Sequence, residues 1–252
     1  MTENQNDLPL PSPAPEGRNE LLAQLLGTQL PEAVYVINYL HQSLKRPGDI
    51  CEFGVAQGAT SALLANEIRH TDKLLWLFDS FEGLPKPTGK DTLLHDIFSL
   101  GAMEKYAGTM AYGVNEVWER LEAISYPPAR VKIVPGFIES TISQGALPER
   151  VCFAYVDFDF YEPILIVLNY LNEHLSRGGC IVVDDYGFFS SGAATAVNEF
   201  LAAHSLEYDL VLPDEAAGHF VILCKRTYWR TLLARVAKPL KAAWRSPAGS
   251  SE

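Results

Sequence analysis

Short apolar runs that alternate with helical segments constrain the fold of this 252-residue chain more than any other feature. The runs are continuous and lack the period of two that is typical of half-exposed strands, so we expect strands buried on both faces. Expected strands are 50–55, 74–78, 131–134, 152–156, 180–183, 208–212 and 220–224, and expected helices are 59–69, 164–175 and 193–204. This order predicts an α/β fold with a doubly wound, mostly parallel sheet, helices on both faces and a closing antiparallel strand pair.

Four segments describe the expected domain organisation. Residues 1–16 are polar and proline-rich without a basic start before an apolar stretch, so we expect a disordered lead-in and no secretory signal. Residues 17–226 form a single domain that begins with helices between Asn19 and Leu44, which Pro31 divides. Residues 84–128 break the strand–helix rhythm and predict either a lid over the site or an ordered decoration. Residues 227–252 form a basic amphipathic tail.

Charge and cysteine content restrict the partners. The net charge of −11 argues against nucleic acid, because binding to phosphates needs a basic surface. The cysteines occur singly in or beside apolar runs, at Cys51, Cys152, Cys180 and Cys224. Buried, reduced thiols are favoured over disulfides or zinc, and they point to the cytoplasm.

The C-terminal tail also allows an interpretation in another functional class, that of a membrane-associated or assembly module. Apolar residues from Trp229 to Trp244 recur near helical spacing among basic residues, as in a helix that lies on anionic lipid. We favour instead a terminal helix that packs on its own domain or on a partner subunit. Membrane association is therefore the less favoured interpretation of the tail. A homo-oligomer is expected as well.

A glycine-containing loop follows the first strand, with Gly54 and Gly58 ahead of the next helix. The second strand ends in Asp79, where a carboxylate can accept hydrogen bonds from both hydroxyls of a ribose. Together they favour a nucleoside cofactor, although the loop lacks the GxGxxG pattern. The alternative is a pair of tight-turn glycines and an aspartate that caps a helix.

Four aspartates follow two other strands. Asp157 and Asp159 end the fourth strand, and Asp184 and Asp185 end the fifth. Neighbouring parallel strands lie about 4.8 Å apart, so these carboxylates converge if the two strands are adjacent. Carboxylates packed together repel unless a cation neutralises them, and oxygen ligands suit Mg²⁺, Ca²⁺ or Mn²⁺. The alternative is helix capping, most simply by Asp159.

With these motifs, the chain resembles the macrocin O-methyltransferase family from about Arg46 to His204. Five segments carry the resemblance: 47–55 (PGDICEFGV), 78–85 (FDSFEGLP), 134–141 (VPGFIEST), 157–162 (DFDFYE) and 178–187 (GGCIVVDDYG). The family's first loop usually has an aromatic and a basic residue where this chain has Ala56 and Gln57, and its Asp-Gly-Asp has Phe158 in the middle.

The resemblance implies a Rossmann-like methyltransferase that uses S-adenosyl-L-methionine and Mg²⁺, or another divalent cation, to methylate a sugar hydroxyl of a natural product. It implies that Asp157, Asp184 and Asp185 hold the metal and that Asp159 is the general base. The residues implied to bind the cofactor are Glu52, Gly54, Val55, Gly58, Asp79, Ser80, Gly136, Phe137 and Asp157.

The sequence leaves open the class of acceptor and the identity of the general base. A catechol or another vicinal diol is an alternative acceptor, because a metal ion would chelate it in the same way. His95 and His219 are rival candidates for the general base, although single histidines are more often surface or packing residues.

Overall fold

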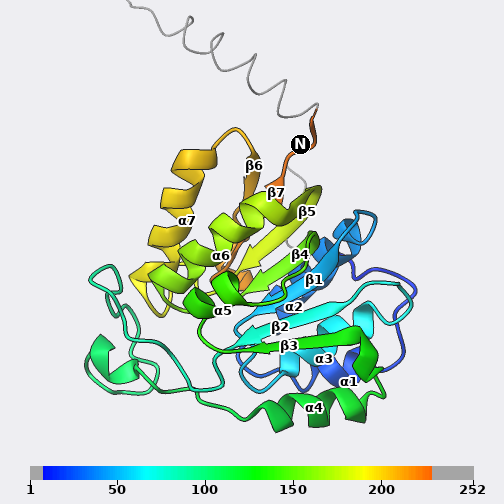
Figure 1. Cartoon of the computed structure of the whole chain (residues 1–252), viewed down its shortest axis with the longest axis horizontal. Helices are drawn as coiled ribbons and strands as arrows, with labels where there is room; N and C mark the ends of the chain where they lie inside the picture. Colours follow the sequence, from blue (N-terminus) through cyan, green and yellow to red (C-terminus); the bar gives the residue numbers. More distant parts are fainter. Residues whose placement is uncertain (1–7, 229–252) are drawn as a thin grey trace, which may run out of the picture.

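The computed structural model describes residues 8–228, in which one seven-stranded sheet forms the centre. In the order in which they lie side by side, the strands are β3 (Val131–Pro135), β2 (Leu75–Asp79), β1 (Asp49–Phe53), β4 (Val151–Val156), β5 (Leu175–Val183), β7 (Val221–Lys225) and β6 (Tyr208–Val211) (Figure 1). Strands β1 to β5 pair in parallel, and β7 pairs antiparallel with β5 and β6. The predicted fold class is confirmed, including the closing antiparallel pair.

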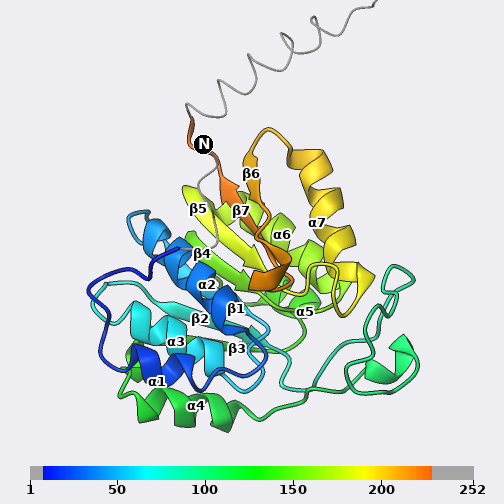
Figure 2. The same cartoon turned by 180° about the vertical axis from the view of Figure 1, so that it is seen from behind.

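Helices cover both faces of the sheet. They are α1 (Arg18–Leu22), α2 (Leu30–Ser43), α3 (Ala59–Glu67), α4 (Val114–Ala123), α5 (Ile138–Gln144), α6 (Tyr161–His174) and α7 (Ser191–His204), with 3₁₀ turns η1 (Met103–Tyr106), η2 (Pro128–Arg130) and η3 (Glu215–Ala217). Helices α5, α6 and α7 lie on the face seen in Figure 1, and α1 to α4 lie on the opposite face seen in Figure 2. One apolar core lies under each face.

The central strands are buried on both sides, which explains their unbroken apolar sequence. All six residues of β4 are buried. Successive side chains of β1 enter opposite cores, Ile50 on the α2–α3 side and Cys51 on the α6–α7 side. Period-two alternation is therefore absent because neither face of this part of the sheet meets solvent.

Two elements differ from the expectation. Strand β5 begins at Leu175, earlier than residue 180, because Leu175 already pairs with Val151 ahead of a register shift, after which the ladder resumes at Cys180. Helix α5 follows β3 and was not predicted. Pro31 lies in the first turn of α2, where its missing N–H costs no intrahelical hydrogen bond.

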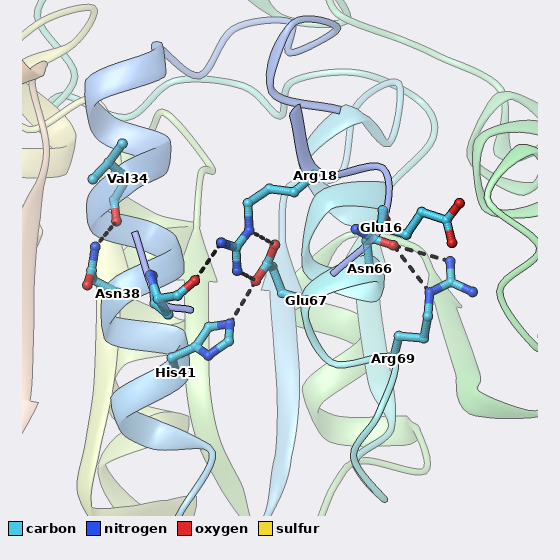
Figure 3. Close-up of polar contacts among 9 residues, drawn as sticks. Glu16, Arg18, Val34, Asn38, His41, Asn66, Glu67 and Arg69 are labelled. Atoms are coloured by element: carbon cyan, nitrogen blue, oxygen red, sulfur yellow. Dashed lines mark hydrogen bonds and ion pairs between the residues drawn. The ribbon is translucent and has the colours of Figure 1, made fainter. Parts of the chain in front are cut away.

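A buried ion pair fastens the N-terminal segment to the sheet-covering helices. Arg18 donates to both carboxylate oxygens of Glu67, with Nε–Oε1 and Nη2–Oε2 distances of 2.6 and 2.5 Å, and His41 Nε2 lies 2.7 Å from Oε2 (Figure 3). Arg18 also donates to the carbonyl oxygen of Pro11 at 2.7 Å. Of the proposed lead-in, Leu8, Leu10, Pro11 and Glu16 thus contact the domain, and residues 1–7 lie outside the described range.

The insertion at residues 84–128 contains η1 and α4. Its first part folds back so that residues 108 and 109 lie beside residue 84. Leu84 N donates to Thr109 O at 2.9 Å, and Gly108 N donates to Leu84 O at 2.8 Å. In Figure 1 the part of the segment that precedes α4 projects from the edge at which β2 and β3 end, and α4 lies beside α3. An isolated bridge from Leu93 to Ser190 ties it to the residues before α7. The expected lid function stays a prediction.

Asp91 anchors this insertion on α6. Its Oδ2 accepts hydrogen bonds from Thr88 N and Oγ1 at 2.7 and 2.8 Å, and its Oδ1 accepts one from Tyr161 N at 2.7 Å. Residues 88–93 are therefore part of the ordered domain, and Asp91 satisfies the first turn of α6.

Between residues 8 and 228, no helix is both long enough and apolar enough to cross a bilayer. The proposed basic tail from Trp229 onward, including its apolar spacing, lies outside the described residues. Its lipid-binding and packing alternatives, the cytoplasmic location and the expected homo-oligomer stay predictions.

Candidate active site

A cavity of roughly 400 Å³ opens at the carboxyl ends of the parallel strands. It lies where the strand order reverses, between β1 and β4, which is the usual ligand position in an open α/β sheet. The predicted site residues on its wall are Gly54, Val55, Asp79, Ser80, Gly136, Phe137, Asp157, Asp159, Asp184 and Asp185. Five separate loops thus bring these residues together.

Two predicted cofactor residues, Glu52 and Gly58, are not part of this wall. Glu52 is 1% exposed and accepts a hydrogen bond from Ser61 Oγ at 2.5 Å. Gly58 precedes α3 with a φ of 76°, and an added Cβ would lie 3.1 Å from Val117 Cα. Both residues therefore support the loop after β1 without lining the cavity.

Replacing Glu52 by glutamine is expected to stabilise the protein increasingly as pH rises. Burial raises the pKa of Glu52 from 4.5 to about 8, so between these values the folded protein keeps a proton that the unfolded chain releases. Wild-type stability falls with pH across this window, and Glu52→Gln removes that contribution. We expect a gain on the order of 2–4 kcal/mol at pH 8, since each pKa unit corresponds to about 1.4 kcal/mol.

Urea unfolding of both proteins between about pH 5 and pH 8 measures this effect. The exposed Glu119→Gln in α4 is the matched control for the loss of one carboxylate. A constant stability difference between Glu52→Gln and wild type across the range would contradict the protonated, buried state of Glu52.

Gly54 lets β1 and β4 approach closely at their carboxyl ends. Its φ is 87°, and an added Cβ would lie 1.9 Å from the carbonyl oxygen of Asp157. Asp157 N donates to Phe53 O at 2.7 Å in the same region. Glycine here makes room for the backbone of Asp157 and so positions the carboxylate that follows β4.

Asp79 lies on the cavity wall and holds two turns. Its Oδ2 accepts hydrogen bonds from Val55 N at 2.7 Å and Ala56 N at 3.0 Å. Its Oδ1 accepts one from Phe81 N at 2.7 Å. The carboxylate therefore fixes the loop after β1 and the turn after β2 while it borders the cavity.

Three aspartates form a compact group of oxygen ligands. Asp157, Asp159 and Asp185 each offer a carboxylate oxygen, and these atoms lie within 4.8 Å of one another. Asp184 lies beside them, with Oδ2 accepting from Tyr155 Oη at 2.6 Å and Oδ1 from Asp185 N at 2.8 Å. The four aspartates therefore do converge. The hydrogen bond from Tyr155 of β4 holds the Asp184 carboxylate in place.

Burial and mutual repulsion both oppose negative charge in this cluster. Burial is the first cause that raises the pKa of Asp157 and Asp159 well above the ordinary value, followed by the charges of the neighbouring aspartates. Burial, and then the charge of Asp185, raises the pKa of Asp184 to about 7. A divalent cation would remove this repulsion, and an all-oxygen donor set fits Mg²⁺, Ca²⁺ or Mn²⁺.

The helix-capping alternative for Asp159 does not hold. The N-cap residue of α6 is Phe160, and the side chain that accepts from Tyr161 N is Asp91. Asp159 and Asp185 instead have left-handed backbones, with φ of 60° and 53°. Non-glycine residues in this region are uncommon and cluster at functional sites.

Glu32 and Tyr155 belong to the site but carried no recognisable sequence signal. Tyr155 Oη lies 3.1 Å from Glu32 Oε1 as well as 2.6 Å from Asp184. Glu32 is 3% exposed on the cavity wall, and burial, then the charges of Asp184 and Asp157, raises its pKa. A glutamate in a first helical turn is common without any function, so only its burial identifies it.

The two histidines lie at the rim. Phe188 is stacked between them, with ring centroids 4.6 Å from His95 and 4.5 Å from His219. His219 borders the cavity, whereas His95 is not among the wall residues and its Nδ1 lies 2.7 Å from Phe188 O. This places His95 in a packing role at the rim.

The outer cavity wall is apolar and partly exposed. Ile97 and Phe98 of the insertion are 42% and 48% exposed, and Leu26, between α1 and α2, is 52% exposed. The cavity thus combines a carboxylate-rich floor with an apolar rim, as suits a small ligand that is polar at one end.

Several known proteins are similar to this chain. The 8-demethyl-8-(2,3-dimethoxy-alpha-L-rhamnosyl)-tetracenomycin-C 4'-O-methyltransferase of Streptomyces olivaceus is 28% identical over 177 residues, 69% of this chain and 65% of that protein. Demethyldecarbamoylnovobiocin O-methyltransferase of Streptomyces niveus is 27% identical over 173 residues, 67% of this chain and 63% of that protein. The chain thus matches slightly less than two thirds of the length of these relatives.

Solved structures share the fold. The O-methyltransferase NovP superimposes with a TM-score of 0.66 at 22% identity, over 79% of this chain and 81% of NovP. The calicheamicin methyltransferase CalS11 gives 0.60 at 22% identity, over 82% of this chain and 83% of CalS11. The family model described as macrocin-O-methyltransferase (TylF) matches residues 33–221, which include strands β1 to β6 and the first residue of β7. The chain therefore belongs to the macrocin-O-methyltransferase (TylF) family.

Proposed function

We propose that this protein is an S-adenosylmethionine-dependent, divalent-cation-dependent O-methyltransferase that methylates a sugar hydroxyl of a glycosylated natural product. One observation carries the proposal: the buried carboxylate of Asp159 and the half-buried carboxylates of Asp157, Asp184 and Asp185 share a cavity with the loop after β1 and with Asp79. Family membership and the activities for which the relatives are named support the acceptor class.

S-adenosylmethionine would occupy the half of the cavity that faces β1 and β2. Gly54 and Val55 would border its methionine end, Asp79 its ribose, and Gly136 with Phe137 its adenine. When bound, this cofactor supplies a methyl group that is already activated for in-line displacement. The work left to the chain is to align an acceptor oxygen and to remove its proton.

The cation would be held by carboxylates on the floor of the cavity. Asp157 and Asp185 belong both to the set expected from the sequence and to the compact group in the structure. The sequence resemblance assigns the third position to Asp184, which Tyr155 orients through its hydrogen bond. A bound cation would lower the pKa of an acceptor hydroxyl, and the outer hydrogen bond would hold its ligand in place.

Asp159 would accept the acceptor proton. It is 7% exposed, borders the cavity and leaves helix capping to Asp91. Its pKa is raised, first by burial and then by the charge of Asp185, which makes its carboxylate a stronger base than an exposed aspartate.

Replacing Asp159 by asparagine tests the base assignment. We expect turnover to fall by about 10²–10⁴-fold while the affinity for S-adenosylmethionine changes little, since only the proton acceptor is lost. Asparagine tolerates the left-handed backbone at this position as well as aspartate does. Calorimetry with S-adenosylmethionine and single-turnover assays measure the two quantities separately.

Several results would contradict the proposal. Unchanged turnover in Asp159→Asn would exclude it as the base, and full activity in excess EDTA would exclude the cation. Binding of NAD without binding of S-adenosylmethionine would exclude the cofactor. Assays of catechol and of TDP-rhamnose, the sugar nucleotide for which the similar CalS11 is named, compare the acceptor classes, and methylation of catechol alone would favour the diol alternative.

A further inference from the structure

Two cysteines face each other across the antiparallel part of the sheet, away from the cavity. Cys180 of β5 and Cys224 of β7 are direct partners in the strand register. Their sulfur atoms lie 2.7 Å apart, and the residues are 44 positions apart in the chain. This separation is only about 0.7 Å longer than an S–S bond.

The backbone geometry at this position suits a disulfide. Opposite residues in an antiparallel pair have Cα atoms about 4.5–5.5 Å apart, inside the 4.4–6.8 Å range of disulfides. The neighbouring pairs Ile181–Leu223 and Val182–Ile222 consist of fully buried residues, so packing holds the two strands in this register. The bond therefore needs no rearrangement of the sheet.

Exposure and the direction of the pKa shifts distinguish this pair from the other two cysteines. A hydrogen bond with Cys224 is the main cause that lowers the pKa of Cys180, and Arg46 contributes in the same direction. Cys224 is partly exposed, which gives a small reagent access. Cys51 and Cys152 are fully buried, and burial raises the pKa of both thiols.

We propose that Cys180 and Cys224 are a site of reversible covalent modification that forms a cross-strand disulfide with a low-molecular-weight disulfide such as oxidised glutathione. The Cys224 thiolate attacks one glutathione sulfur, which forms a mixed disulfide and releases one glutathione thiolate. The Cys180 thiolate then attacks the Cys224 sulfur, which closes the protein disulfide and releases the second glutathione. The two electrons and two thiol protons of the cysteine pair end on two molecules of reduced glutathione.

The cross-link would join β5 to β7. Strand β5 leads directly into Asp184 and Asp185, so the bond would hold the base of the strand that carries half of the acidic cluster. Because it restricts the unfolded chain, we expect the thermal midpoint of the oxidised protein to rise by roughly 5–10 °C. The proposal does not depend on the methyltransferase activity.

Intact-mass measurement of the wild-type chain in oxidised glutathione tests the proposal directly. The expected result is a loss of two hydrogen atoms, a proteolytic peptide that joins Cys180 to Cys224, and full reversal by dithiothreitol. The double variant Cys51→Ala/Cys152→Ala should behave like wild type. Cys180→Ala and Cys224→Ala should each lose the cross-linked peptide and the rise in thermal midpoint.

Three results would overturn it. They are a wild-type chain that keeps all its thiols, a wild-type chain that carries only glutathione adducts, and a linked peptide that contains Cys51 or Cys152. Each of these is read from the wild-type protein and does not depend on whether a variant folds.

Discussion

Replacing Asp185 by asparagine is expected to weaken the binding of Mg²⁺ or Mn²⁺ by at least about 100-fold and to remove most methyl transfer. Loss of an outer-shell partner alone costs about 10–100-fold in metal affinity, so loss of a direct ligand should cost more. Asp185 offers one of the three clustered oxygens, and asparagine fits its left-handed backbone. Calorimetry with Mn²⁺ measures the affinity.

The same variant should change stability in opposite directions with and without the cation. Burial raises the pKa of Asp185, and the charge of Asp185 adds to burial and to the charge of Asp184 in raising the pKa of Asp157, so the metal-free variant should be more stable than the metal-free wild type. At a concentration about 100 times its dissociation constant, the cation should stabilise only the wild type, by about 2.7 kcal/mol. Asp72→Asn, at an exposed position, is the control and should show neither effect.

Two further variants separate the roles of Asp184 and Asp159. If Asp184 is the third ligand, Asp184→Asn weakens Mn²⁺ binding and Asp159→Asn leaves it nearly unchanged. If Asp159 supplies the third oxygen, as the compact group allows, the order is reversed. An Asp185→Asn protein that binds Mn²⁺ as tightly as wild type would contradict both arrangements.

Replacing Glu67 by alanine is expected to lower the free energy of unfolding by about 3–5 kcal/mol, because it leaves Arg18 as an uncompensated buried charge. The side chains of Arg18 and Glu67 are 2% and 0% exposed, and His41 approaches the same carboxylate (Figure 3). Urea unfolding measures the loss. The exposed pair Lys90–Glu199, with side chains 45% and 47% exposed, provides the control, and Glu199→Ala should cost much less.

The pH dependence of this effect has the opposite sign to that of Glu52. Burial alone would raise the pKa of Glu67, but hydrogen bonds from Arg18 and His41 outweigh burial and lower it from 4.5. The stabilisation is therefore present above the unfolded value and is lost as pH falls through the folded pKa. The difference between wild type and Glu67→Ala should shrink below about pH 4.5, and a difference that grows there would contradict the ion pair.

The double variant Arg18→Met/Glu67→Leu distinguishes charge from packing. It removes both charges while it keeps apolar volume, so it should be far more stable than Glu67→Ala. A double variant as unstable as the single one would show that packing, not the unpaired charge, carries the effect.

The sequence predicted the sheet and the meeting of the aspartates because both depend on local pattern. Buried parallel strands are continuous apolar runs, and a residue that ends such a strand reaches the same edge wherever the strand lies. Asp157 and Asp184 could therefore be placed at the same edge of the sheet, and the pairing of β4 with β5 supplies the adjacency on which their convergence depends. The early start of β5 was missed because Arg177, Gly178 and Gly179 are typical of a turn.

The partners of the cluster could not be predicted, because they depend on how α2 crosses the sheet. Glu32 and Tyr155 are 123 positions apart, and neither has a sequence context that marks a site. In the same way, Asp91 caps α6 from a position 70 residues before Tyr161, which left Asp159 as the simplest candidate cap in the sequence. Contacts between distant segments decide these points, and one sequence contains no direct record of them.

The two ends of the first part of the insertion lie side by side, which offers a way to change the acceptor preference. Leu84 pairs with Gly108 and Thr109, so the chain leaves and re-enters the domain at one point, and the excursion carries Ile97 and Phe98 to the cavity rim. A segment with such adjacent ends can be exchanged for another of different length without disturbing the register of the strands around it. Residues 94–107 are therefore a natural unit for grafting between relatives, in which the rim changes while the carboxylate floor is inherited intact.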